Sequence, residues 1–149
     1  SRNEIESLPV EIKNLKKLKR LGLNYQNLTS FPIEICSLKK LGELYLRGNK
    51  ITEVPPEIGD LKNLTGLDLR GNRITHLPKE IIQLKHLKLL FLDGNPLVEP
   101  PLEIVVKGKD AIFSYFLTKY TNTTNIQPSQ PNSLNTQSLE DVTLYTKQR

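Results

Sequence analysis

The hydrophobic positions of this chain recur with a fixed period of 23 residues. The phrase Leu-x-x-Leu-x-Leu occurs four times at that spacing, beginning at Leu18, Leu41, Leu64 and Leu87. A fixed period of this length is typical of stacked supersecondary units, each of which packs mainly against its neighbours. The pattern therefore predicts an elongated array of repeats and not a single closed core.

Each repeat continues in the same order, and the order predicts its local structure. Leu-x-Leu alternates with a period of two, which predicts a short strand with its leucines on one face. In the clearest repeat, Pro55 stands before Glu57, Ile58 and Leu61. Proline fixes φ and favours a helix start or a short 3₁₀ turn. The isoleucine and the leucine three residues later share one side of that turn, so we expect them to fill the core.

An amide follows the third leucine of each phrase, where the chain must turn. The four amides are Gln26, Asn49, Asn72 and Asn95. A side-chain amide donates and accepts hydrogen bonds, so it can satisfy the backbone groups that a turn leaves unpaired inside the stack. Gln26 departs from the asparagine pattern, and we expect its longer side chain to reach the same backbone groups.

This pattern resembles the leucine-rich repeat family over about residues 1–121. The resemblance implies an α/β solenoid: a parallel concave β-sheet, short helical or 3₁₀ turns on the convex side, and a C-terminal capping helix. The 23-residue form with Leu-Pro-x-Glu-Ile-x-x-Leu is similar to the intracellular class, which includes Ras-group and Roco proteins. That class implies a cytoplasmic location and a role in signal transduction.

Three segments follow from where the pattern ends. Residues 1–100 carry the repeats, with a partial first copy; residues 101–121 hold the last repeat remnant and a capping helix; residues 122–149 form a polar linker or tail. Ile112, Phe113, Phe116, Leu117 and Tyr120 recur at helical spacing, and Asp110 is the expected N-cap. Residues 101–116 also resemble the segment that, in Roco proteins, leads into a Ras-like GTPase domain.

Candidate chemistry is scarce. The single cysteine, Cys36, excludes an internal disulfide framework and has no histidine at a comparable position of the repeat, which argues against a catalytic thiol. His76 and His86 have no cysteine or carboxylate at metal-ligand spacing. We therefore expect no enzymatic activity, no metal and no cofactor.

The net charge of +5 falls on the repeats, because the charges of the tail cancel. Much of the excess lies just before the strands, at Lys16, Lys17, Lys39, Lys40, Lys62 and Lys85. A basic face could attract nucleic acid or an acidic membrane. A solvated face that keeps a leucine-rich stack soluble is the favoured interpretation, so neither nucleic acid nor membrane is the expected partner.

Binding must then depend on residues that the repeat does not dictate. Twelve strand positions point away from the leucines and form the concave face: Arg20, Gly22, Asn24, Glu43, Tyr45, Arg47, Gly66, Asp68, Arg70, Leu89, Phe91 and Asp93. Exposed aromatic and arginine side chains are typical of binding hot spots. The predicted partner-binding residues are Tyr45, Arg47, Asp68, Arg70, Leu89 and Phe91.

The predicted function is a non-catalytic scaffold that binds a protein partner through the concave face. A small GTPase and another domain of the parent chain are the candidate partners. The alternative is a docking or regulatory segment of a larger signalling enzyme, such as a Roco-type GTPase. The repeat pattern also begins abruptly at Asn3, so edge-to-edge self-association through an uncapped first repeat is a further expectation.

Overall fold

The computed structural model describes residues 7–124. The chain divides into two compact units between Glu99 and Pro100, and each is described by itself. The predicted linker or tail, 122–149, lies outside the described residues from position 125 onward.

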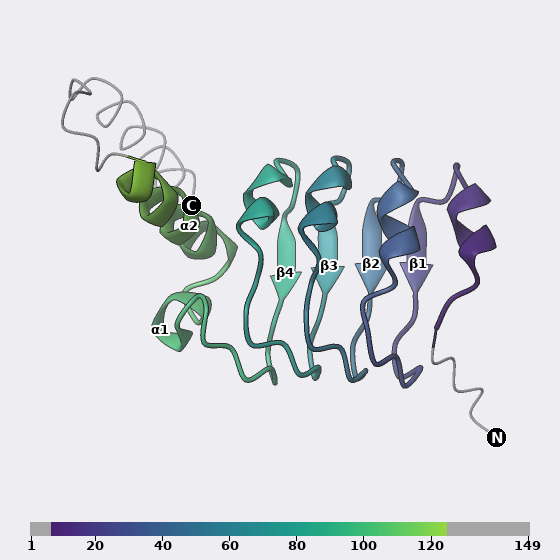
Figure 1. Ribbon diagram of the computed structural model, residues 1–149, viewed down its shortest axis with the longest axis horizontal. Coiled ribbons are helices and arrows are strands. Elements are labelled where there is room, and N and C mark those ends of the chain that lie inside the picture. Colours follow the sequence, from purple (N-terminus) through teal and green to yellow (C-terminus); the bar gives the residue numbers. More distant parts are fainter. Residues whose placement is uncertain (1–6, 125–149) are drawn as a thin grey trace. The chain divides into compact units, whose positions relative to one another are not determined.

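The N-terminal unit contains one parallel sheet of four short strands. These are β1 (Arg20–Gly22), β2 (Glu43–Tyr45), β3 (Gly66–Asp68) and β4 (Leu89–Phe91), which lie side by side in the order of the sequence (Figure 1). The register aligns the middle leucines of the repeats: Leu21, Leu44, Leu67 and Leu90. The strands and their register confirm the period-two interpretation of Leu-x-Leu.

Short 3₁₀ turns form a second row of elements. They are η1 (Val10–Asn14), η2 (Ile33–Ser37), η3 (Pro56–Asp60) and η4 (Lys79–Gln83). Each turn is preceded by a proline whose φ lies between −66° and −74°, the range that proline prefers. Each turn packs against the next one in the chain. The predicted turns on the side of the sheet opposite to the concave face are confirmed.

The core is built from the repeated apolar positions. The isoleucine and leucine of each later turn are fully buried: Ile35, Leu38, Ile58, Leu61, Ile81 and Leu84. The first repeat is less well covered, since η1 buries no residue and both Val10 and Leu15 stay about half exposed (51% and 49%). Burial is therefore deepest in the middle of the array.

Asparagine side chains join consecutive repeats. The Nδ2 group of Asn72 donates to the carbonyl oxygen of Leu46 in the preceding repeat (2.9 Å) and to that of Leu69 in its own repeat (3.0 Å). Its Oδ1 atom accepts from the Ile51 backbone N–H (3.1 Å). Asn49 and Asn95 repeat this arrangement. The predicted role of the amides is thus confirmed for the three asparagines.

Gln26 does not take this role, so the expectation that its longer side chain reaches the same groups is wrong. Its Nε2 group donates to the exposed carbonyl of Asn24 (3.1 Å), and the buried carbonyl of Leu23 is bonded by Asn49 instead. The backbone of the first turn also differs from that of the later turns, because Asn27 has a positive φ (63°) and the equivalent residues Lys50, Arg73 and Pro96 do not. An amide one methylene longer, on a turn of different shape, projects outward.

The C-terminal unit contains two helices, α1 (Leu102–Val105) and α2 (Lys109–Thr124), separated by Gly108 at φ 97°. The predicted helical spacing is confirmed, since Ile112, Phe113 and Phe116 are almost completely buried. The N-cap prediction is wrong: the Ile112 N–H bonds the Gly108 carbonyl, and Asp110 lies inside the first turn. That α2 caps the repeats stays a prediction.

Among the described residues, neither helix has the length and apolar character that crossing a membrane requires.

The amide ladder predicts a large and specific loss of stability in the Asn72→Ala variant. The substitution leaves the buried Ile51 N–H without its partner, at a cost of about 1–3 kcal/mol. It also removes one of the two side-chain hydrogen bonds to each of the Leu46 and Leu69 carbonyls, which keep those from Asn49 and Asn95. We expect urea denaturation to reveal a decrease of about 2 kcal/mol in the free energy of unfolding.

Asn63→Ala is the matched control, because Asn63 is exposed and its amide donates only to the Lys39 carbonyl at the surface. Its free energy of unfolding should change by about 0.5 kcal/mol or less. Equal losses in the two variants would contradict the proposed role of the amide ladder.

Candidate functional site

The concave face is an ordered grid of side chains. Strand pairing aligns Arg20, Glu43, Gly66 and Leu89 in one column, and Gly22, Tyr45, Asp68 and Phe91 in the next. A third column follows the strand ends and contains Asn24, Arg47, Arg70 and Asp93. The grid matches the predicted columns, so its chemistry depends on which side chains are already paired with each other.

The first cluster on this face joins β1 and β2 through Glu43. The Tyr45 hydroxyl donates to Glu43 Oε2 at 2.6 Å, and Arg20 Nε lies 2.6 Å from the same oxygen. The hydrogen bond from Tyr45, followed by that from Arg20, holds the pKa of Glu43 below its ordinary value. The same hydrogen bond raises the pKa of Tyr45. The polar end of Tyr45 therefore already has a partner within the protein.

The second cluster is centred on Asp68, which is only 3% exposed. Arg70 binds this carboxylate with both arms of its guanidinium group: Nε lies 2.9 Å from Oδ1 and Nη2 lies 2.7 Å from Oδ2. The Arg70 backbone N–H adds a third hydrogen bond at 3.1 Å. Burial opposes ionisation of Asp68, but the hydrogen bonds and the charge of Arg70 outweigh it, so the pKa of Asp68 is lowered.

Arg70 also lies over the ring of Phe91, with its guanidinium carbon 4.7 Å from the ring centroid. This contact has the geometry of a cation–π interaction. The structure thus brings three of the predicted site residues, Asp68, Arg70 and Phe91, into one cluster. The charges of Asp68 and Arg70 are paired with each other, and Arg70 covers one side of the Phe91 ring. The other side of this ring is the part of the cluster that is available to a partner.

Arg47 differs from Arg70 although it stands at the same position of the neighbouring repeat. It is exposed, and it forms no ion pair with any residue between positions 7 and 124. Its guanidinium carbon lies 6.0 Å from the centroid of the Tyr25 ring. Arg47 is therefore the arginine of this face whose charge is open to an incoming group.

Tyr25 is a residue of this face that the sequence interpretation missed. It occupies the turn position that holds Gly48, Gly71 and Gly94 in later repeats, and like them it has a positive φ. Its ring lies against Gly48, where an added Cβ atom would be only 2.2 Å from two ring carbons. The side chain is 55% exposed. The break in the glycine column was the signal that could have found it.

The last strand of the sheet presents apolar side chains to solvent. Leu89 is 55% exposed and Phe91 is 37% exposed. Both are neighbours of smaller or polar groups on β3, since Leu89 pairs with Gly66 and Phe91 with Asp68. Adjacent exposed apolar groups on a rigid sheet are characteristic of interaction surfaces.

The predicted surface lysines lie at the turns before the strands, and all six are exposed. One contact with an acid is found among them, between Lys39 and Asp60 at 3.9 Å, a distance at which an exposed pair adds little stability. His76 and His86 are exposed as well. Within the described residues, no three metal-ligating side chains gather at one point.

Cys36 lies in the interior and is only 5% exposed. Burial, followed by the nearby charges of Glu57 and Asp60, raises the pKa of its thiol to about 12. Because thiolate is the nucleophilic form, this environment is opposite to that of a catalytic cysteine.

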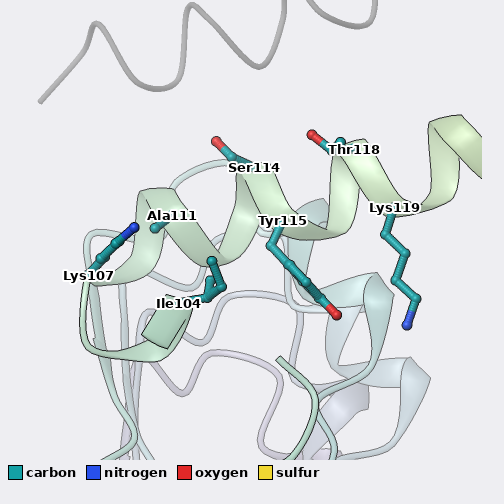
Figure 2. A pocket seen from close by; sticks show the side chains of 7 residues that line it. All are labelled: Ile104, Lys107, Ala111, Ser114, Tyr115, Thr118 and Lys119. Atoms are coloured by element: carbon teal, nitrogen blue, oxygen red, sulfur yellow. The ribbon is translucent and has the colours of Figure 1, made fainter. Parts of the chain in front are cut away.

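A hollow of about 550 Å³ lies on the C-terminal unit, along α2 and the end of α1. Figure 2 shows that the hydroxyl groups of Ser114 and Thr118 lie on one side of α2, whereas Tyr115 and Lys119 extend on the other. The described lining residues include no carboxylate and no histidine. Their polar groups do not converge on one point, so the hollow lacks the arrangement of an active site.

Comparison with known proteins identifies the class. A leucine-rich repeat family model matches residues 39–97. A leucine-rich repeat protein of Leptospira interrogans has a similar solved structure, with 45% sequence identity and a TM-score of 0.64, covering 70% of this chain and 26% of its own. No curated protein sequence matches the chain significantly.

Two plant receptors are also similar. The peptide hormone receptor RGFR1, solved in complex with RGF2, has 37% identity and a TM-score of 0.56, covering 60% of this chain and 15% of its own. The ectodomain of the Arabidopsis thaliana receptor kinase GASSHO1/SCHENGEN3, solved with CASPARIAN STRIP INTEGRITY FACTOR 2, has 39% identity and a TM-score of 0.56, covering 61% and 11%.

The family match shows leucine-rich repeats over residues 39–97, and the similar structures together with the parallel sheet show the fold of an α/β leucine-rich repeat solenoid. The chain spans about a quarter of the Leptospira protein and smaller shares of the two receptors.

Arg70 is paired with Asp68, whereas Arg47, at the same position of the neighbouring repeat, has no ion pair among the described residues. We therefore predict that Arg70 and Arg47 contribute differently to stability. Arg70→Ala leaves a nearly buried carboxylate without its partner, and we expect the free energy of unfolding to fall by about 1–3 kcal/mol. Arg47→Ala should change it by about 0.5 kcal/mol or less. Urea denaturation of both variants at neutral pH provides the measurement, and a larger loss for Arg47→Ala would refute the assignment.

The environment of Cys36 predicts a thiol that is protected in the folded protein. A thiol reagent at about pH 8 should leave Cys36 unmodified until urea unfolds the chain. The folded-state pKa of about 12 lies above the ordinary value of 9.0. The neutral thiol therefore contributes its full stability below about pH 9, and this contribution is lost as the pH rises toward 12. Rapid modification of the native protein would contradict this prediction.

Proposed function

We propose that this protein is a non-catalytic interaction scaffold that binds a protein partner on its concave face. The observation that carries the proposal is that Tyr25, Arg47 and Leu89 are exposed on one side of a hydrogen-bonded sheet. No polar partner for the Arg47 guanidinium group is found between residues 7 and 124.

The physical basis is a rigid frame with accessible anchors. The backbone beneath these side chains is fixed by the parallel ladder and the asparagine bonds. A fixed backbone reduces the entropy that a partner must overcome on binding. Aromatic and arginine side chains are the most frequent hot-spot residues, and Tyr25, Arg47 and Phe91 provide both types.

The similar structures support this proposal. The two receptors are solved in complex with RGF2 and with CASPARIAN STRIP INTEGRITY FACTOR 2, respectively. We transfer from them only the expectation of a protein or peptide partner. The narrower expectations stay proposals: a small GTPase or parent-chain domain as partner, a Roco-type parent enzyme, self-association through the first repeat, and a cytoplasmic location.

A display library of random peptides tests the proposal without a known partner. Peptides selected on the whole chain would be titrated against a concave-face variant, Tyr25→Gly with Arg47→Ala and Leu89→Ala. These substitutions remove three exposed side chains. Tyr25→Gly also restores the glycine of the later repeats, which relieves a positive φ and keeps the expected change in stability within about 1 kcal/mol. We expect affinity to fall at least tenfold.

Ile33→Ala with Lys85→Ala is the matched control, since it removes one exposed apolar side chain and one exposed charge elsewhere on the repeats. Its affinity for the selected peptides should equal that of the wild type. Peptides that bind the concave-face variant as tightly as the wild type would overturn the proposed function.

A further inference from the structure

The third column of the concave face contains two opposite charges that have no ionic partner. Arg47 and Asp93 are both exposed, and neither forms an ion pair in the described part of the chain. Arg70 stands between them in the column and is attracted by Asp93 without forming an ion pair with it, because its guanidinium group binds Asp68. The face therefore presents one open positive charge and one open negative charge.

The separation of the two charges is set by the backbone. The ladder continues past the strand ends, because the Gly48 N–H bonds the Arg70 carbonyl (2.8 Å) and the Gly71 N–H bonds the Asp93 carbonyl (2.9 Å). Adjacent strands lie about 4.8 Å apart. Arg47 and Asp93 are two strands apart, so about 10 Å separates their backbone positions along the array.

The separation between Arg47 and Asp93 fits one backbone conformation of a partner segment better than the alternatives. A polyproline II segment rises about 3.1 Å per residue with three residues per turn, so side chains three residues apart lie about 9 Å apart on the same side. In a β-strand, side chains on one side lie about 6.7 or 13 Å apart, which fits less well. An amphipathic helix would need a long apolar groove, whereas Leu89 and Phe91 are the exposed apolar side chains among the twelve concave-face positions.

From this arrangement, and resting on the proposed function, we infer the chemistry of the partner. The concave face binds an extended, polyproline II-like segment of another protein that carries a carboxylate and a cationic side chain three residues apart. The carboxylate contacts Arg47 beside the Tyr25 ring, and the cation contacts Asp93. Leu89 and Phe91 provide the apolar surface next to the cationic end.

The assignment of each charge fixes which end of the segment lies over Arg47. A carboxylate near Asp93 or a cation near Arg47 would meet a like charge, and such contacts are strongly unfavourable at an interface. A segment with two acids or two bases at this spacing should therefore bind less tightly than a segment with one acid and one base.

A proline-rich peptide library tests this inference. In each peptide, two positions that are two, three or four residues apart vary among Asp, Glu, Lys, Arg and Ala. Selection would be carried out on the whole wild-type chain and on the variant Arg47→Glu. The substitution falls on an exposed side chain without an ion pair in the described part of the chain, and the thermal midpoint would confirm that the variant is folded.

On the wild type we expect enrichment of one acid and one base three residues apart. The Arg47→Glu variant presents two acidic side chains and should prefer two bases at the same spacing, with a change in relative affinity of about tenfold or more. No enrichment on the wild type, another spacing, or an unchanged preference in the variant would each overturn the inference.

The random library described above separates this failure from failure of the proposed function. Peptides that lose affinity for the concave-face variant but lack the charged pair would retain the proposed function and refute the inference. Peptides that ignore every concave-face substitution would refute both.

Discussion

The structure depends on one interaction, the hydrogen bonding of an asparagine side chain to backbone groups of two consecutive repeats. Asn49 donates to the carbonyls of Leu23 and Leu46, at 2.9 Å each, and accepts from the Leu28 N–H at the same distance. These groups are buried, and an unpaired buried backbone group is costly. The asparagine thus holds neighbouring repeats at one offset. The leucines and the 3₁₀ turns fill the space that this offset creates.

The same constraint separates structural from functional positions. Because the amides and the core fix the strands, the side chains on the concave face do not determine the fold and can differ between repeats. Some of them bind each other, as Asp68 and Arg70 do. Arg47 and Asp93 do not, and they carry open charges on the same column. We therefore expect binding specificity in such an array to depend on which side chains of the face are paired with each other, and not on residue type alone.

The sequence predicted much of the fold because backbone requirements recur in every repeat. The leucines indicate the strands, the prolines indicate the 3₁₀ turns, and the asparagines indicate where buried backbone carbonyls accept side-chain hydrogen bonds. The exceptions arose where the repeat is irregular. Gln26 projects outward from a turn in which Asn27 has an additional positive φ, and the helix begins before Asp110. Both errors came from assuming regular geometry at an irregular position.

The candidate site was less predictable. Its twelve positions follow from the alternation of side chains along the strands. Two features could not be predicted without side-chain conformations: the bidentate pairing of Arg70 with Asp68, which leaves Arg70 unavailable to a partner, and the place of the Tyr25 ring over Gly48. Chemical-shift mapping of the whole, isotope-labelled chain with a selected peptide tests the central claim most directly. The account predicts the largest amide shifts on Tyr25 and on β2 to β4 with the residues just after these strands, which include Arg47 and Asp93. Largest shifts on the 3₁₀ turns η1 to η4, or on α2, would contradict it.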